Sequence, residues 1–228
     1  MTLTNAEHGT RVGGSRGVLL SAEALTFGYR ADAPIITNWS AEFRAGEVVA
    51  LTGPSGSGKS TLLYLLGLML TPQSGQIRLL GRSATGLRDH ERARLRAFSF
   101  GFVFQDAALD STRTVLDNVI ETALYRSQDR QSAVVRALEL MERFGVALRA
   151  DAKPGQVSGG QAQRIALCRA LLGAPQVLLA DEPTGNLDIS SSAVVIDALH
   201  EQAATGSTVI VVTHDPTVVS RCDRSIEL

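Results

Sequence analysis

Runs of valine, isoleucine and leucine alternate with helical patterns along most of this 228-residue chain. Short apolar runs bounded by polar residues predict β-strands, at residues 18–27, 47–52, 76–80, 100–104, 177–181 and 208–213. The last two runs are almost continuously apolar, which is typical of parallel strands that are covered on both faces. A helical pattern at 189–204 lies between them. This part of the chain therefore predicts a strand–helix–strand unit and an α/β fold.

The middle of the chain has a different pattern. Helices are predicted at 61–70, 91–96 and 131–144, and Gly145 supplies a stop for the last one. That helix carries an apolar stripe at helical spacing, which we expect to pack in a core: Val134, Val135, Leu138, Met141 and Phe144. The α/β core is therefore predicted to be interrupted by a mainly helical insert at about 105–160.

The chain begins with a polar, glycine-rich stretch. Residues 1–17 contain no apolar core segment, and we predict a disordered tail there, followed by one domain at 18–228. The most apolar run extends from Leu62 to Leu70. It is much shorter than the roughly 20 residues that a membrane-spanning helix needs, so we expect it to be a buried helix.

A glycine-rich segment, G-P-S-G-S-G-K-S, matches the P-loop pattern and follows a predicted strand. Its glycines let backbone N–H groups point at one anion, and the helix that follows adds a partial positive charge. Lys59 can reach the β- and γ-phosphates of a nucleotide, and Ser60 can bind Mg²⁺. We therefore predict a phosphate site made by Gly53, Ser55, Gly56, Ser57, Gly58, Lys59, Ser60 and Thr61.

Two carboxylates stand together at the end of the strand at 177–181. Asp181 is where a carboxylate holds Mg²⁺ beside a P-loop, and Glu182 is placed to deprotonate a water that attacks the γ-phosphate. His214 and Gln105 also follow predicted strands. His214 could hydrogen-bond the γ-phosphate or the water, and Gln105 could bind Mg²⁺ through its carbonyl oxygen. Spacing alone leaves a purely structural role open for both residues.

These motifs together resemble the ATP-binding cassette (ABC) family of ATPases. The segment V-S-G-G-Q at 157–161 is similar to the family signature L-S-G-G-Q, with valine in place of leucine. The segment G-N-L-D at 185–188 resembles the D-loop, and the motifs follow the family order over 18–228. In the family an aromatic ring stacks on adenine. Tyr29 is at that place, and Phe27 is the competing candidate.

The resemblance implies a fold, an activity and a mode of assembly. The implied fold is a P-loop NTPase core with a mostly parallel sheet, an N-terminal antiparallel β part and a helical insert that carries the signature. The implied activity is Mg²⁺-dependent hydrolysis of ATP, with Lys59, Gln105, Glu182 and His214 as catalytic residues and Ser60, Gln105 and Asp181 at the metal. Two such chains, most simply two identical ones, would dimerise head to tail. Each would then cap the other's ATP with Ser158, Gly159, Gly160 and Gln161.

The resemblance also bears on the partner. The segment D-E-P-T-G-N-L-D resembles the branch that serves lipoprotein release, macrolide export and cell division. It implies an ATPase subunit at the cytoplasmic face of the inner membrane, bound to a separate transmembrane permease. The residues after Gln105 depart from that branch and are similar to bacteriocin or peptide exporters. They supply apolar candidates for a groove that holds a permease helix, although core packing is an equally open role: Phe104, Ala107, Leu109, Val115 and Leu116.

Three classes of function stay open on the sequence. The first is an ATPase that drives export or mechanical work on a membrane partner. The second is a regulator of cell division or cell-wall hydrolysis that acts through a membrane partner without transport. The third is a soluble ABC ATPase that acts on nucleic acid or ribosomes. The net charge of −1 counts against a nucleic-acid partner, which we do not expect.

Overall fold

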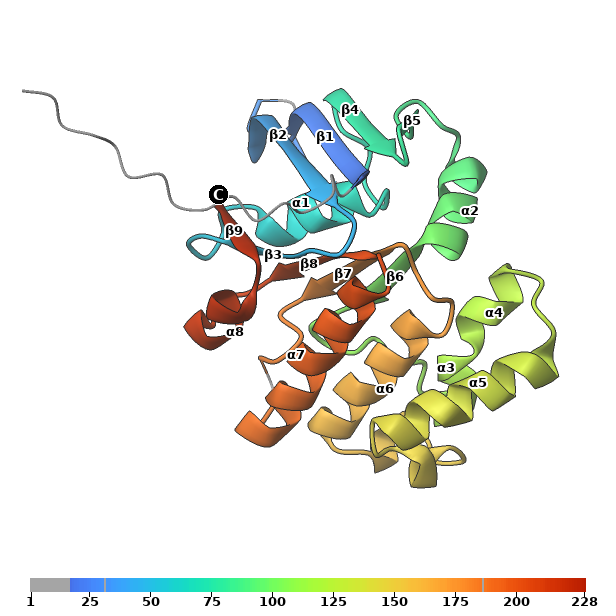
Figure 1. Ribbon diagram of the computed structural model, residues 1–228. Helices are drawn as coiled ribbons and strands as arrows, with labels where there is room; N and C mark the ends of the chain where they lie inside the picture. Colours follow the sequence, from blue (N-terminus) through green and yellow to red (C-terminus); the bar gives the residue numbers. More distant parts are fainter. Residues whose placement is uncertain (1–16, 31, 186) are drawn as a thin grey trace, which may run out of the picture.

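The computed structural model describes residues 17–30, 32–185 and 187–228 (Figure 1). Residues 1–16 of the predicted disordered segment lie outside the described residues, and so does Asn186 of the predicted D-loop. The carbonyl of Gly17 accepts a hydrogen bond from the Ala45 N–H at 2.9 Å, which ties the start of the described chain to the first sheet. Within these ranges, no helix combines the length and the apolar character needed to span a membrane.

One sheet has four antiparallel strands in the order β2–β1–β4–β5 (Figure 1). Its strands are β1 (Val18–Phe27), β2 (Ile36–Arg44), β4 (Ser74–Leu79) and β5 (Arg82–Ser83). The sequence pattern did not predict β2, because only Ile36 and Phe43 of its nine residues are buried. Nor did it predict β5, which contains only two exposed residues. The antiparallel part that the family resemblance implied is confirmed.

The second sheet has five strands in the order β6–β7–β8–β3–β9, and every neighbouring pair is parallel. Its strands are β3 (Val48–Thr52), β6 (Phe100–Val103), β7 (Val177–Asp181), β8 (Thr208–Val212) and β9 (Arg224–Glu227). All residues of β7 and β8 are buried, as their continuous apolar runs predicted. The prediction missed β9, because this edge strand is mostly polar and exposed.

The described helices are α1 (Lys59–Leu66), α2 (Asp89–Ser99), α3 (Val115–Val119), α4 (Glu121–Tyr125), α5 (Arg130–Arg143), α6 (Gly159–Leu171), α7 (Ile189–Ala204) and α8 (Pro216–Arg221), with 3₁₀ turns at Ala147–Arg149 and Pro154–Gln156. Helix α1 begins earlier and ends earlier than the predicted 61–70. It ends at Gly67, where a Cβ would lie 2.6 Å from the Phe102 ring and 2.9 Å from the Leu179 side chain. Glycine therefore allows β6 and β7 to pack closely against the end of this helix.

The parallel sheet separates two apolar cores. Alternate residues of each strand point to opposite faces, so Leu179 of β7 packs with α1 while its neighbour Leu178 packs with the helices of the other core. Helix α1 lies between the two sheets, and α6 and α7 cover the far face of the parallel sheet (Figure 1). This layered arrangement confirms the predicted α/β fold of a P-loop NTPase. It also places the starts of α1 and α6 on opposite faces of the parallel sheet.

The buried face of α5 differs from the predicted stripe. The structure buries Ala133, Ala137, Leu140 and Met141, while Val135 and Leu138 are exposed. Only Met141 and the capping residue Phe144 are buried as predicted, and Val134 is half-buried. Helical spacing allowed two overlapping stripes, and the structure selects the one whose alanines let neighbouring helices approach closely.

Candidate functional site

The P-loop connects the end of β3 to the start of α1. Three of its glycines have backbone angles that side chains rarely adopt, with φ of 81° at Gly56, 137° at Gly53 and 95° at Gly58. The last two are also confined by their neighbours. A Cβ on Gly53 would lie 2.5 Å from the Leu228 carbonyl oxygen, and one on Gly58 would lie 2.6 Å from the Ile35 side chain. Glycine is therefore required at both positions by conformation and by space. The loop keeps its backbone N–H groups at the positive end of α1.

The polar side chains of this loop fit an anion. The Lys59 ammonium donates hydrogen bonds to the carbonyls of Gly53, at 3.0 Å, and Pro54, at 2.7 Å. The Ser57 Oγ is buried and has no hydrogen-bond partner in the described chain. A buried hydroxyl without a partner is costly, and phosphate oxygens would satisfy it. A fixed cation, a free hydroxyl and a helix start thus fit the predicted phosphate site.

Asp181 lies beside the start of α1, at the end of β7. Its carboxylate accepts hydrogen bonds from the Ser60 hydroxyl at 3.1 Å and from the Tyr64 hydroxyl at 3.3 Å. Burial raises the pKa of this carboxyl above its usual value, and the two hydrogen bonds oppose that rise. A carboxylate and a hydroxyl are the oxygen donors that Mg²⁺ prefers, with phosphate and water completing its coordination. The residues present therefore fit a magnesium ion.

Tyr64 is a site residue that the sequence analysis missed. It lies in the apolar run of α1, where an aromatic side chain suggests only core packing. Burial and the neighbouring Asp181 raise the pKa of the Tyr64 hydroxyl above its usual value, so this group stays a hydrogen-bond donor. The sequence did contain a sign of this role. Tyr64 follows Ser60 by four residues, and residues at that spacing share one face of a helix, so Tyr64 could have been expected to lie near the metal site.

Glu182 and His214 meet at the carboxyl edge of the parallel sheet. The His214 Nδ1 lies 2.8 Å from the Glu182 Oε1. Glu182 has a left-handed backbone, with φ of 46°, and its N–H donates to the Val212 carbonyl at 2.9 Å. Strained backbone of this kind clusters at functional sites. The structure thus joins two residues that the sequence predicted from separate strands.

The contact with Glu182 affects the titration of His214. The hydrogen bond to Glu182, and then the charge of Glu182, raise the pKa of His214 above its usual value of 6.5. A raised pKa means that the folded protein favours the imidazolium form. The ion pair is therefore present at low pH and is lost as the pH rises through the raised pKa. Above that pH His214 is neutral, and only a hydrogen bond without the charge of the imidazolium can join it to Glu182.

Gln105 follows β6 at the same edge of the sheet. Val103 of β6 pairs with Ala180 of β7 in parallel register. Gln105 and Glu182 each come two residues after this pair, so the two strands deliver them to neighbouring positions. Gln105 itself is exposed. The loop after it contains two alanines with left-handed backbone, Ala107 with φ of 55° and Ala108 with φ of 47°. Such a conformation costs about 1 kcal/mol for each residue other than glycine.

The two candidates for the adenine ring differ in exposure. Tyr29 is 68% exposed and Phe27 is 8% exposed. The two rings meet edge to face, with centroids 5.2 Å apart. Because Phe27 packs in the core below, Tyr29 is the ring with a face available for stacking.

The signature segment begins α6. Ser158 caps this helix by accepting a hydrogen bond from the Gln161 N–H at 3.3 Å, and the Gln161 side chain accepts one from the Ser158 N–H at 3.0 Å. The first N–H groups of Gly159 and Gly160 have no partner within the helix. A Cβ on Gly160 would lie 3.4 Å from Leu187 of the D-loop. The structure thus places the signature beside the D-loop, on the opposite face of the sheet from the P-loop helix.

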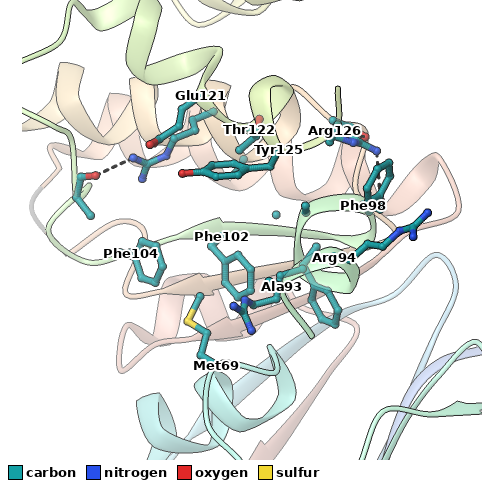
Figure 2. Close-up of a pocket in the computed structure, with 18 of the residues that line it drawn as sticks. Met69, Ala93, Arg94, Phe98, Phe102, Phe104, Glu121, Thr122, Tyr125 and Arg126 are labelled. Atoms are coloured by element: carbon teal, nitrogen blue, oxygen red, sulfur yellow. Dashed lines mark hydrogen bonds between the residues drawn. The ribbon is translucent and has the colours of Figure 1, made fainter. Parts of the chain in front are cut away.

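A groove of about 910 Å³ lies between the α2–β6 segment and α4 (Figure 2). Figure 2 shows Phe102, Phe104 and Met69 on one side and Tyr125 on the other. Four of its lining residues are arginines and one is a glutamate: Arg94, Arg96, Arg126, Arg169 and Glu121. Of the apolar candidates named from the sequence, Phe104 lines this groove, and the other four take the core-packing role that the sequence left open. Ala107 and Val115 are buried in the core, and Leu109 and Leu116 pack against it.

Comparisons with known proteins agree with this geometry. The ABC transporter family matches residues 36–185. The lipoprotein-releasing system ATP-binding protein LolD of Paramagnetospirillum magneticum is 42% identical over 198 residues, which cover 86% of this chain and 88% of that protein. The macrolide export ATP-binding/permease protein MacB of Salmonella typhimurium is 44% identical over 194 residues, but these cover 85% of this chain and only 30% of MacB.

Solved structures show the same fold. A bacterial ABC transporter cassette, MJ0796, has been solved as a dimer and is 33% identical, with a TM-score of 0.86 over 92% of this chain and 94% of that chain. The same cassette has been solved in a post-hydrolysis dimeric state bound to ADP and phosphate, with the same similarity. The predicted family and branch are confirmed. This chain belongs to the ABC transporter family and is one of its ATP-binding cassettes.

Proposed function

We propose that this chain hydrolyses ATP to drive a separate membrane permease, as one half of a head-to-tail pair. The observation that carries the proposal is the cluster at the carboxyl edge of the parallel sheet, where Asp181 bonds to Ser60 and Glu182 bonds to His214. Both pairs lie beside a P-loop that fits phosphate. The relatives named above are ATP-binding proteins of lipoprotein release and macrolide export. They favour an export or mechanical role over the regulator of cell division.

Nucleotide binding is assigned to the P-loop and its neighbours. Lys59 and the N–H groups of the loop bind the phosphates, and the exposed ring of Tyr29 stacks on the base. Mg²⁺ would be held by Ser60, Asp181 and the Gln105 carbonyl. When bound, it neutralises charge on the phosphates. Tyr64 orients the Asp181 carboxylate through its hydroxyl.

Hydrolysis is assigned to Glu182 and His214. The Glu182 carboxylate accepts a proton from the attacking water as the water oxygen bonds to the γ-phosphorus and the bond to ADP breaks. His214 contacts this carboxylate in the folded protein, and we assign to it a hydrogen bond to the γ-phosphate during the reaction.

The two phosphate cradles explain the pairing. The starts of α1 and α6 lie on opposite faces of the parallel sheet, so one chain cannot apply both to one phosphate. A second copy turned head to tail supplies Ser158 and the Gly160 N–H to the γ-phosphate held by the first. ATP favours the closed pair because only the triphosphate reaches both halves. The dimeric solved cassettes support this arrangement.

The first test is hydrolysis itself. Purified chain is expected to release phosphate from Mg-ATP, and Lys59→Ala is expected to lower that rate by at least about hundredfold, as loss of a preorganised charge does. The matched control is Lys153→Ala, which removes a lysine that also donates to a backbone carbonyl, far from the P-loop in sequence. Equal rates for wild type and Lys59→Ala would refute the assigned site.

The groove is the proposed docking site of the permease at the cytoplasmic face of the inner membrane. Its aromatic floor suits apolar side chains, and its arginines suit a carboxylate. Three of the four arginines donate to backbone carbonyls, while Arg94 makes no hydrogen bond or ion pair within the described residues and lies over the Phe98 ring. The occupant is therefore a cytoplasmic helix of the permease with apolar residues and a carboxylate.

Charge reversal in the groove tests this docking. In cells that make the native partner, Arg94→Glu is expected to move the chain from the membrane fraction to the soluble fraction, while hydrolysis by the purified chain stays unchanged. The matched control is Arg136→Glu, an exposed arginine of α5 that lies outside the groove. If Arg94→Glu stayed with the membranes as wild type does, the groove would not be the docking site.

A further inference from the structure

Two buried side chains of α6 hold the loop that follows Gln105. The Gln163 amide, in a residue that is 5% exposed, donates to the Phe104 carbonyl at 3.2 Å. Arg169 is 8% exposed, and its two terminal nitrogens donate to the carbonyls of Ala107 and Ala108, each at 2.7 Å. The signature helix therefore bonds to the backbone on both sides of Gln105.

The loop needs such support. Ala107 and Ala108 both have left-handed backbone, which alanine rarely adopts. The bonds within the loop are short-range: the Ala107 N–H donates to Phe104 at 3.1 Å and the Ala108 N–H to Asp106 at 2.6 Å. A fork of two donors from Arg169 fixes the orientation of two successive carbonyls. The strained turn persists because a rigid element outside it holds both peptide groups.

Arg169 in turn depends on the loop. The described residues place no carboxylate within ion-pair distance of its guanidinium. Burial lowers the pKa of Arg169 below its usual value, and the charge of Glu121 opposes that shift. A buried charge needs polar partners, and the carbonyls of Ala107 and Ala108 supply them. Relaxation of the loop would therefore leave a buried cation unsatisfied, so the helix and the loop keep one common arrangement.

We infer that Arg169 and Gln163 are positioning residues that fasten the Gln105 loop to the signature helix. The helix has Ser158 at its start and is about 20 Å long at 1.5 Å per residue. It thus joins the residue that caps the partner's ATP to the residue that faces the chain's own ATP. The attachment therefore makes the position of Gln105 depend on the position of the signature helix. This inference rests on the proposed function, because it takes Gln105 to act on nucleotide.

A double-mutant cycle tests whether Arg169 acts through Gln105. Arg169→Met is expected to lower kcat for Mg-ATP by about tenfold and to change KM by less than about twofold, because the P-loop still binds the phosphates. In a Gln105→Ala background the same change should lower kcat by less than about twofold, since the group it positions is gone. Equal losses in the two backgrounds, on an enzyme that hydrolyses ATP, would overturn the inference.

Relief of strain provides a rescue. Glycine adopts the left-handed backbone without cost. Adding Ala108→Gly to Arg169→Met should therefore raise kcat by about threefold or more over that of Arg169→Met alone. If Arg169→Met does not fold, Gln163→Met takes its place in the same cycle. Its matched control is Gln202→Met, which removes from α7 an amide that donates to the Pro175 carbonyl at 3.0 Å and should leave kcat unchanged. Equal losses for Gln163→Met and Gln202→Met would also overturn the inference.

Hydrogen exchange separates failure of this inference from failure of the proposed function. Backbone amides at 104–109 are expected to exchange faster in Arg169→Met or Gln163→Met than in wild type, whereas Gln202→Met should leave them unchanged. This readout needs no hydrolysis. A chain without Lys59-dependent hydrolysis would contradict the proposed function, and unchanged exchange in the two variants would contradict the loop attachment by itself.

Discussion

Glu182→Gln is expected to bind Mg-ATP and to hydrolyse it at least about hundredfold more slowly than wild type, because an amide cannot accept the proton of the attacking water. The amide keeps the size of the carboxylate, so the nucleotide site stays intact. ATP then remains unhydrolysed and the closed pair accumulates. Light scattering of the purified variant should show that its mass doubles when Mg-ATP is added and that ADP has no such effect.

The matched control for this variant is Glu139→Gln, which alters an exposed glutamate of α5. It should hydrolyse ATP as wild type does and should not accumulate as a pair. A Glu182→Gln variant with undiminished hydrolysis would show that Glu182 is not the base. A slow but persistently monomeric variant would show that two copies of this chain do not suffice. The second ATPase would then be a different chain, or the permease would have to hold the two halves together.

Ser158→Arg is expected to abolish hydrolysis while the isolated chain still binds nucleotide with wild-type affinity. Ser158 begins α6, which lies on the opposite face of the sheet from the P-loop helix, so the new side chain does not enter the chain's own site. In a pair it would occupy the place where the partner's γ-phosphate is capped. A fluorescent nucleotide measures binding to the monomer, and phosphate release measures hydrolysis.

Mixing variants makes this prediction sharper. Ser158→Arg and Lys59→Ala should each be inactive alone. A mixed pair contains one site that joins an intact P-loop to an intact signature, and it should recover part of the hydrolysis. Ser158→Ala serves as the control for the helix cap, since it removes the capping hydroxyl, at about 1 kcal/mol, without adding bulk. Loss of nucleotide binding by the Ser158→Arg monomer would contradict a site shared between two chains.

The sequence by itself determined the parts of the site that are built from contiguous residues. The P-loop and the end of β7 at Asp181 are local structures, because glycine conformations and strand ends depend on near neighbours. The continuous apolar runs of β7 and β8 likewise predicted a parallel sheet. These motifs sufficed to assign the family and the α/β fold.

Only the tertiary structure decided which distant residues meet. Tyr64 reaches Asp181, and Arg169 reaches the loop after Gln105, through packing between elements far apart in the chain. The same packing chose the alanine face of α5 over the valine stripe. It also set α1 and α6 on opposite faces of one sheet. A pattern in the chain records which side chains are apolar, but contacts across a core depend on how whole helices and strands fit together.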